Sequence, residues 1–495
     1  MQPPDAPPVA TGPVRPCAVA VVGAGLAGLV AAYRLTQQGH RVTLFERHAA
    51  AGFVAHSVGV PGPYGGSGGS GGPGAAVRVD VPIRVFYAGY YPTLTRLYAE
   101  LGVATEAVSY ASSFHGEDGA LYFRYRNWLV GGRSFSWVAP GDLLGARGAR
   151  AWRIAAEALR FRRRATRALA TGDLGTLSIG EYLAAEGYGH DFVHGLLLPA
   201  IATVCTCSYD DARRFPAAVV VDYLARGLTR EPVRRAALGA DEVARRLLAG
   251  AGELRLGCAL QSLRREAPGQ AVASREAGLS CSPSTRGVLL RLADGRVERF
   301  DHVVLATQAN QALALLDDAS ATERAVLGGF AYRPIEVVMH RDERLLPARR
   351  GDWSAVNLLV TPAHAQPQST IWVNRVQPAL AGAARPGPGP GLDWAPVFQT
   401  VHPIVPPRDE AVISRARFER PVVDAASQRA LAALAPLHAE AGRCVWFCGS
   451  YAQPGIPLLE SAVRSAEVVA GLMAGALAAG QAAPRAWVAP ALLPA

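Results

Sequence analysis

Three glycines near the start of the chain have the spacing that is needed to hold a phosphate-containing ligand. Gly23, Gly25 and Gly28 form the pattern G-x-G-x-x-G directly after the apolar run 19–22. The first glycine permits a tight turn, the second lets a pyrophosphate approach the backbone, and the third lets a helix and a strand pack closely. Glu46 follows about 18 residues after the last glycine, where a carboxylate can accept hydrogen bonds from the hydroxyls of an adenosine ribose. These residues predict a dinucleotide site.

This chemistry requires a strand, a turn, a helix and a second strand in that order. Residues 19–22 are continuously apolar, as in a parallel strand that is buried on both faces. Ala32 and Leu35 continue the inward face of the following helix, and Gly39 ends it. Residues 41–45 have the pattern of the second strand. We therefore expect the pyrophosphate at the N-terminus of the helix that begins in the glycines.

The other end of the chain carries a second pattern. Residues 443–475 predict a buried strand, a turn at Gly449 and Ser450, and a long helix that begins near Glu460. This segment resembles the closing motif of FAD-binding amine oxidases and related desaturases. In those families the glycine lies against the FAD phosphates and the final helix points its N-terminus at the flavin, where it stabilises the negative charge of the reduced ring.

The middle of the chain adds to the resemblance. Residues 239–263 resemble the helix and strand whose backbone contacts the FAD adenine near Leu260, and residues 300–307 resemble the strand that ends in an Ala-Thr turn. The resemblance implies that FAD is the cofactor. The residues that it and the glycine motif assign to FAD binding are Gly23, Ala24, Gly25, Leu26, Ala27, Gly28, Glu46, Arg47, Gly52, Leu260, Ala306, Thr307, Gly449, Ser450, Leu459, Glu460 and Ala462.

More specifically, the chain resembles a group of amine-oxidase-like FAD proteins that are often considered beside cyclopropane fatty acid synthases. The resemblance is carried by residues 79–103, 303–316, 369–377 and 418–431. The chain also departs from the family pattern. Ala51-Gly52 replaces a double glycine, Ala462 replaces a glycine, and residues 457–459 read Pro-Leu-Leu.

The order of these segments predicts an interleaved α/β fold. A Rossmann-like FAD-binding domain, of the amine oxidase and glutathione reductase type, is expected from residues 15–78, 236–312 and 436–480. An α+β substrate domain is expected from residues 79–235 and 313–435, and residues 1–14 and 481–495 are expected to be flexible tails. A simple nicotinamide dehydrogenase would complete its sheet within one continuous stretch, so this layout favours FAD over NAD.

Composition excludes several kinds of chemistry. The 495 residues include 50 arginines and no lysine. A Schiff-base lysine, a pyridoxal phosphate site and a lysine-dependent phosphate loop are therefore excluded. Many flavin amine oxidases place a lysine on a substrate-domain strand near the flavin. Ordinary lysine-assisted amine oxidation is weakened accordingly.

The formal net charge of +10 is compatible with binding to an anionic partner, such as a membrane surface or a nucleic acid. Residues 147–167 hold eight arginines against one glutamate, and Trp152 and Leu159 could line a less charged side of a helix there. A solvated helix face and peripheral attachment to an anionic membrane are both consistent with this segment. No motif suggests nucleic-acid binding.

The seven cysteines are odd in number and do not form a disulfide framework or a zinc-binding pattern, so no metal site is expected. Cys17, Cys444 and Cys448 fall in or beside predicted strands, which indicates reduced thiols and a cytoplasmic protein. The longest apolar helix candidate, 468–479, is too short to span a bilayer. We therefore expect a soluble or peripheral protein.

The sequence contains no recognisable catalytic triad, metal-binding cluster or carboxylate pair that would identify a reaction. This is compatible with a flavin enzyme, which needs few catalytic side chains. The resemblance places five pocket candidates on substrate-domain elements: Tyr90, Tyr91, His340, Trp372 and Asn374. The aromatic residues that surround an amine in classical amine oxidases are replaced just before the last helix by Leu458 and Leu459, which favours an apolar substrate.

These observations predict an FAD-dependent oxidase, dehydrogenase or desaturase that acts on a hydrophobic, lipid-like small molecule, with O2 or another electron acceptor. Two alternatives stay open from the sequence. One is a conventional flavin amine oxidase. The other is a non-enzymatic protein that FAD stabilises and that serves at a membrane or partner surface.

Overall fold

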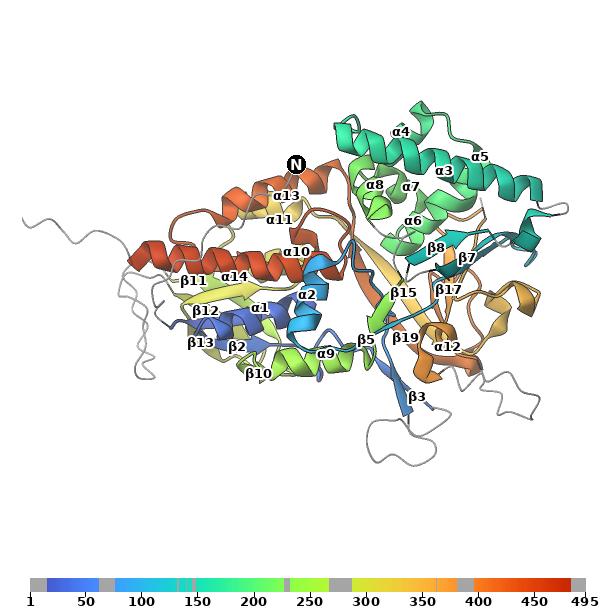
Figure 1. Ribbon diagram of the computed structural model, residues 1–495. Helices are drawn as coiled ribbons and strands as arrows, with labels where there is room; N and C mark the ends of the chain where they lie inside the picture. The colour runs from blue at the N-terminus through green and yellow to red at the C-terminus, as the bar shows by residue number, and fades with distance from the viewer. Residues whose placement is uncertain are drawn as a thin grey trace, which may run out of the picture.

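The chain forms two regions, each built around its own β-sheet (Figure 1). The computed structural model describes residues 16–61, 76–130, 133–138, 140–144, 148–226, 232–266, 287–361, 363–380 and 396–481. The expected tails, 1–14 and 481–495, lie outside these residues except for Gln481.

The first region contains a five-stranded parallel sheet in the order β10-β2-β1-β14-β20. Its strands are β1 (Ala18–Val22), β2 (Arg41–Phe45), β10 (Glu253–Arg255), β14 (His302–Leu305) and β20 (Val445–Phe447). The predicted strands 19–22 and 41–45 are confirmed. Segments more than four hundred residues apart thus share one sheet, as the interleaved fold requires.

Alternating side chains of this sheet face two different layers. Val19 and Val21 pack against one layer, and Ala20 and Val22 against the other. The first layer contains α1 (Leu26–Gln37), α9 (Gly239–Leu248) and α14 (Leu459–Gln481). The second contains the antiparallel strands β11 (Leu260–Arg265), β12 (Val288–Leu292) and β13 (Val297–Phe300) with helices α10 (Ala309–Leu315), α11 (Ala321–Gly328) and α13 (Ala425–His438).

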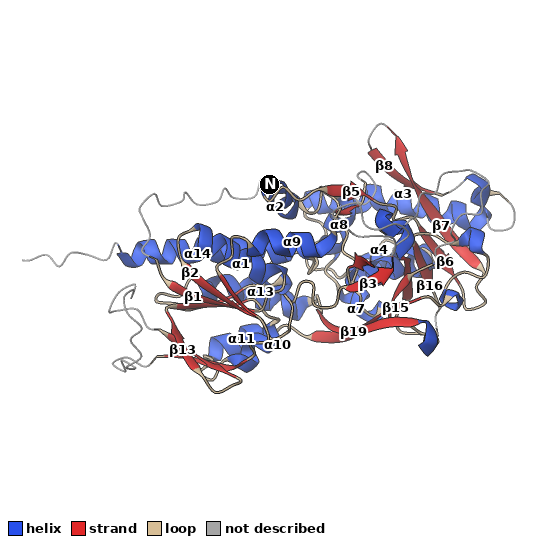
Figure 2. Cartoon of the chain, turned by 90° about the horizontal axis from the view of Figure 1, so that it is seen from below, coloured by secondary structure: helices blue, strands red, loops and turns tan. Residues whose placement is uncertain are grey.

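The second region is built on an eight-stranded mixed sheet in the order β19-β15-β18-β17-β16-β6-β7-β8. Its strands are β6 (Ser112–His115), β7 (Leu121–Val130), β8 (Arg133–Trp137), β15 (Tyr332–His340), β16 (Val356–Leu359), β17 (Gln368–Trp372), β18 (Phe398–Val401) and β19 (Val412–Pro421). Only β6 and β16 pair in parallel within this order. Figure 2 shows β19 running from the middle of the molecule into this sheet.

A layer of helices covers the β6–β8 end of this sheet (Figure 1). The layer contains α3 (Gly148–Thr171), α4 (Ile179–Ala185), α5 (His190–Phe192), α6 (Leu198–Cys205), α7 (Tyr209–Arg214) and α8 (Ala217–Ala225). The helix expected from residues 147–167 is therefore present as α3. Helix α2 (Pro92–Glu100) packs against α14, and short pairs are formed by β3 (Val58–Pro61) with β4 (Ala76–Val79) and by β5 (Thr105–Ala107) with β9 (Arg234–Ala236).

Two expectations need correction. Cys17 is disulfide-bonded rather than reduced, whereas Cys205, Cys207, Cys258, Cys444 and Cys448 are free. Helix α14 is also longer than the expected apolar stretch, and by length and composition alone it could cross a membrane. Half of that stretch is buried in the protein, where α14 packs on α1, as a core helix does.

Candidate dinucleotide site and substrate cavity

The glycine turn between β1 and α1 has the close packing that its motif requires. Gly23 has a φ of +98°, and its N–H donates to the carbonyl oxygen of Phe45 at 2.8 Å. A Cβ added at Gly28 would lie 1.8 Å from the carbonyl oxygen of Gly23. No side chain fits there, so Gly28 is required for the turn itself.

Gly25 has a different environment from Gly28. A Cβ added at Gly25 would meet no atom within 4 Å, so the N-terminus of α1 borders open space. The N–H groups of Gly25, Leu26 and Ala27 have no hydrogen-bond partner within the described part of the chain. Such N–H groups at a helix N-terminus bind anions. The turn thus fits the pyrophosphate of a dinucleotide.

Glu46 lies beside this turn with its carboxylate buried. One carboxylate oxygen accepts from the Ala24 N–H at 2.8 Å, and the other accepts from the His48 N–H at 3.0 Å. A Cβ added at Gly52 would lie 2.8 Å from the first oxygen, so Gly52 leaves room for the carboxylate. The side chain of Arg47 is exposed. Glu46 therefore has the position of a ribose acceptor, at the end of β2.

The start of β11 reaches the same place. The N–H of Gly257 donates to the carbonyl of His48, and the N–H of Cys258 donates to the carbonyl of Glu46, both at 2.8 Å. Leu260 begins β11 two residues later and is half-buried. This places Leu260 near the end of the dinucleotide site where the Glu46 carboxylate lies.

The ends of β14 and β20 complete the edge of the sheet. The Ala306 N–H donates to the carbonyl of Val22 at 2.9 Å, and a Cβ at Gly23 would lie 3.1 Å from the Ala306 oxygen and 3.3 Å from the Thr307 methyl group. A Cβ at Gly449 would lie 3.2 Å from the Thr307 oxygen. Gly449 has a φ of +153°, which favours glycine. The predicted residues at three strand ends are thus brought together.

The closing helix begins at Leu459, close to the predicted start, but the Glu460 side chain has a partner of its own. Its carboxylate accepts from the N–H groups of Thr93 and Leu94 at 3.1 and 2.9 Å, at the N-terminus of α2. Ala462 is buried, and Ser450 is half-buried. The Glu460 carboxylate is therefore engaged with the N-terminus of α2.

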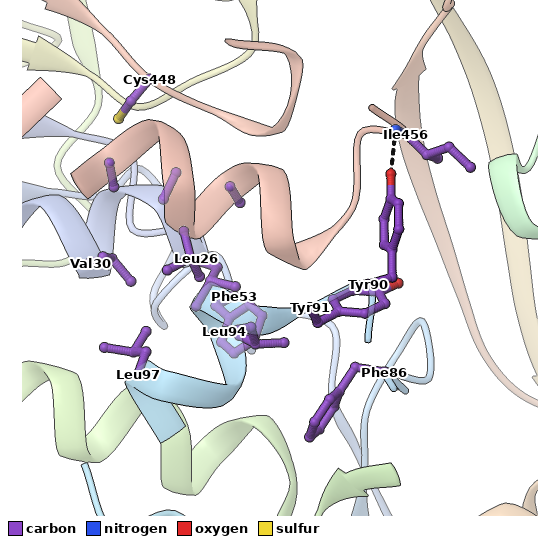
Figure 3. Packing of buried hydrophobic residues seen from close by; sticks show 14 of the residues in the cluster. Leu26, Val30, Phe53, Phe86, Tyr90, Tyr91, Leu94, Leu97, Cys448 and Ile456 are labelled. Atoms are coloured by element: carbon purple, nitrogen blue, oxygen red, sulfur yellow. Dashed lines mark hydrogen bonds between the residues drawn. The ribbon is translucent and has the colours of Figure 1, made fainter. Parts of the chain in front are cut away.

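Tyr90 and Tyr91 lie just before α2, and Tyr90 points toward the chain that leads into α14 (Figure 3). The Ile456 N–H donates to the Tyr90 hydroxyl oxygen at 2.9 Å. The Tyr90 ring also packs edge-on against Tyr223, with 4.8 Å between the centroids. Burial raises the pKa of Tyr90 to about 12 and raises that of Tyr91 well above its ordinary value. Both hydroxyls are therefore protonated at neutral pH.

The other three pocket candidates lie elsewhere. His340 is fully buried, where its two ring nitrogens contact the Thr400 hydroxyl at 2.7 Å and the Asp342 N–H at 3.1 Å. Trp372 packs edge-on against the Trp353 ring. Asn374 lies in the short helix α12 (Val373–Val376) and bonds the backbone of Leu380 and Val397. None of the five candidates, Tyr90 and Tyr91 included, lines the cavity described next, and their role in a substrate site stays a prediction.

The second region contains a cavity of about 560 Å³. Its lining is aromatic and aliphatic apart from a few polar groups, and none of its residues was predicted from the sequence to line a cavity. The lining residues are Tyr110, Phe123, Tyr125, Asn127, Ser136, Trp137, Val138, Ile154, Ala155, Ala158, Leu159, Phe161, Arg162, Ala165, Thr166, Phe192, Leu196, Leu197, Ala200, Val221, Leu224, Ala225 and Val233. This size is typical of a site for one small ligand.

An aromatic layer separates the cavity from the first region. Val221 and Leu224 line the cavity from α8, and Tyr223 on the same helix contacts Tyr90. Tyr90 in turn contacts Ile456, three residues before α14 begins. The cavity is therefore connected to the closing loop of the first region through α8 and the pair Tyr223 and Tyr90.

The fold and this site define a protein with a Rossmann-like parallel sheet whose strand ends fit a dinucleotide. Residues 21–101 match the family model described as an NAD(P)-binding Rossmann-like domain. Comparison with curated protein sequences gives no match.

Among solved structures, the chain is similar to a fatty acid isomerase from P. acnes that produces CLA, with 16% identity, a TM-score of 0.57, and coverage of 92% of this chain and 98% of the other. It is also similar to cyclohexylamine oxidase from Brevibacterium oxydans IH-35A, with 14% identity, a TM-score of 0.57, and coverage of 94% and 100%. Putrescine oxidase is similar at 13% identity, a TM-score of 0.56, and coverage of 93% and 99%. The chain thus has the amine-oxidase-like fold over nearly its full length.

Proposed function

We propose that this protein is an FAD-dependent oxidoreductase that acts on a hydrophobic small molecule. The observation that carries the proposal is the pairing of an open dinucleotide turn at Gly25 with a large apolar cavity in the second region. A bound flavin would supply the electron acceptor. The chain itself would hold the substrate and exclude water.

The residues at the edge of the parallel sheet would hold FAD. The free N–H groups of Gly25 and Leu26 suit the pyrophosphate, and the Glu46 carboxylate suits the ribose hydroxyls. The backbone N-terminus of α14 suits the electron-rich end of a flavin. The fold comparison supports this assignment, because the chain aligns over 93% of its length with a putrescine oxidase whose structural study concerns cofactor binding.

The cavity favours a hydrophobic substrate over an amine. Its described lining contains no carboxylate that could pair with an ammonium group. Fatty acids and amines are the substrates named for proteins of similar fold. The apolar walls stabilise a bound acyl or alkyl chain more than a polar ligand, because burial of apolar surface is favourable.

We also infer that α3 rests on an anionic membrane surface. Trp152 and Leu159 are 54% and 40% exposed and lie seven residues apart, on one face of the helix. Arg163 and Arg167 are exposed beside them and have no carboxylate partner among the described residues. An apolar stripe flanked by arginines is the pattern of an interfacial helix. A hydrophobic substrate would reach the cavity from the same surface.

The test begins with the absorbance spectrum of the purified protein and the mass of the released cofactor. A flavin spectrum with released FAD is expected. Anaerobic screening of lipid classes should then find one that bleaches the flavin, with O2 or another acceptor restoring the colour. A colourless protein that takes up no added FAD would overturn the proposal, and peroxide release from amines alone would favour an amine oxidase.

A further inference from the structure

We propose that the cavity binds an amphiphilic carboxylate, whose charged group pairs with Arg162 and whose apolar body fills the space behind it. This inference deepens the proposed function, on which it rests for the role of the cavity, by naming the class of substrate. It is carried by the apolar character of the lining, by the position of Arg162 on α3 and by the absence of a partner for Arg162 among the described residues.

Arg162 is the one charged side chain in the described lining of the cavity. An isolated charge beside apolar walls is costly unless a partner or water satisfies it. Asn127 and Ser136 also line the cavity, but they bond each other at 3.3 Å, and the Tyr125 hydroxyl accepts from Ser112 at 3.0 Å. The cavity thus has a guanidinium with no partner among the described residues, whereas Asn127, Ser136 and Tyr125 have partners within the protein.

Two other arginines of α3 are paired, whereas Arg162, like Arg163 and Arg167, has no carboxylate partner among the described residues, and of these three only Arg162 lines the cavity. Arg153 pairs with Asp191 at 2.8 Å, and Arg164 pairs with Glu186 at 2.7 Å. These pairs lie on the side of α3 that packs toward α4 and α5. No described carboxylate, carbonyl or aromatic ring contacts Arg162. An anionic ligand can therefore pair with the Arg162 guanidinium without breaking an existing ion pair.

The lining changes from exposed to buried along the cavity. Trp137, Leu159, Arg162 and Thr166 are exposed, whereas Ile154, Phe192 and Val221 are almost completely buried. Leu159, Arg162 and Thr166 are three and four residues apart, so they lie along one side of α3. Arg162 therefore lies at the open end, where a bound carboxylate keeps part of its hydration.

This arrangement selects among head groups. A carboxylate can accept two parallel hydrogen bonds from a guanidinium, which an alcohol cannot do. An ammonium group would meet a like charge at the same place. The apolar body of all three kinds of ligand would gain equally from the walls, so the difference between them reports on Arg162.

The experiment measures binding of three pyrene-labelled ligands of equal chain length, an alkanoate, an alkanol and an alkylammonium, to the purified holoprotein. The alkanoate should bind most tightly. Arg162→Gln should weaken alkanoate binding about tenfold and leave alkanol binding within about twofold. Arg163→Gln is the matched control, because Arg163 is exposed on the same helix and does not line the cavity. It should leave alkanoate binding unchanged.

A second variant tests the location of the ligand. Ala158 lines the cavity, and Ala158→Phe should weaken binding of all three ligands by filling space. The proposal is overturned if the alkanoate binds no better than the alkanol, if Arg163→Gln matches Arg162→Gln, or if Ala158→Phe binds all three as the wild type does. Binding needs no electron transfer, so these outcomes are separate from failure of the lipid screen.

Discussion

At the scale of single residues, two glycines of one motif carry different constraints. Gly28 is confined by the backbone of Gly23, whereas Gly25 faces open space. Gly28 therefore determines whether the turn can form, and Gly25 determines whether a pyrophosphate can reach the turn.

The first prediction compares two substitutions in this motif. Gly25→Ala should fold with a free energy of unfolding within about 1 kcal/mol of wild type, because its Cβ meets no protein atom. FAD binding should weaken about tenfold or more, because the Cβ would occupy the approach of the pyrophosphate. Gly28→Ala should lose folding stability as well, since its Cβ would overlap the Gly23 oxygen. Urea unfolding and flavin fluorescence titration measure the two effects. Equal loss of stability in both variants would contradict the assignment.

The second prediction concerns stability in mild acid. Burial lowers the pKa of His340, His302 and His438 to about 4, against about 6.5 in an unfolded chain. Between these values the unfolded chain binds protons that the folded protein does not. The free energy of unfolding therefore falls as the pH falls from about 6.5 to about 4, by up to about 3 kcal/mol for one fully buried histidine.

The variant His340→Gln removes one of these titrating groups. It should be less stable than wild type at neutral pH, because its contacts to Thr400 and Asp342 are altered. Its further loss of stability on acidification should be smaller than that of wild type. Urea unfolding at neutral and mildly acidic pH measures the difference, and parallel losses in the two proteins would contradict the linkage.

At the scale of elements, α14 and α2 are coupled through one side chain. Glu460, in the first turn of α14, accepts hydrogen bonds from the N-terminus of α2. The coupling positions Tyr90 and Tyr91, which directly precede α2, against the loop that contains Ile456.

The third prediction removes this coupling. Glu460→Ala should lower the free energy of unfolding by about 1–2 kcal/mol, because two N–H groups lose their acceptor. Glu460→Gln should lose less, since an acceptor oxygen remains while the favourable charge at the helix N-terminus is removed. Thermal or urea unfolding of the three proteins measures the order. A glutamine variant no more stable than the alanine variant would contradict it.

The fourth prediction concerns the outer face of α3. The double variant Trp152→Ser, Leu159→Ser should sediment less with anionic vesicles than wild type, because the exposed apolar stripe is removed. Leu238→Ser is the matched control: Leu238 is 69% exposed, but it lies at the start of α9 in the first region. Added salt should also release the wild type, since exposed arginines are screened. Equal sedimentation of all three proteins at low salt would contradict membrane contact through α3.

The elements also show what sequence could and could not predict. The β1-α1-β2 unit is local, so a continuous run of residues contains all of its packing and turn requirements. Glu46 could be placed for the same reason. The positions of His340 and Asn374 could not be predicted in this way. Their partners, Thr400 in β18 and Val397 just before it, are well separated from them along the chain. The cavity could not be predicted either, since its walls come from β7, β8, α3, α6 and α8, and no short motif records that they meet.

At the scale of the whole molecule, the cofactor site joins segments from both ends and the middle of the chain. Strand β1 pairs with β14, and β14 pairs with β20. A ligand at the ends of these strands would contact all three segments at once. Binding to the folded state alone should therefore stabilise the protein as a unit.

The fifth prediction follows from this linkage. Free FAD at about 100 times its dissociation constant should raise the free energy of unfolding of the cofactor-free protein by about 2.7 kcal/mol. The rise should be about half as large, or less, for Gly25→Ala at the same FAD concentration, because its binding is about tenfold weaker or more. Thermal unfolding with increasing FAD measures both, and a transition that does not move with FAD would contradict binding to the folded state.

The interleaved sheet also has a consequence for how the protein is made. Strand β1 leaves the ribosome early, but its neighbour β14 is synthesised some 280 residues later, and β20, the strand that pairs with β14 on its far side, later still. Until then the nascent chain carries an unfinished sheet edge of apolar strands, the kind of surface that associates with other chains. Production of this protein in cells should therefore depend on chaperone capacity, and slower synthesis should not by itself let the nucleotide-binding half fold ahead of the rest.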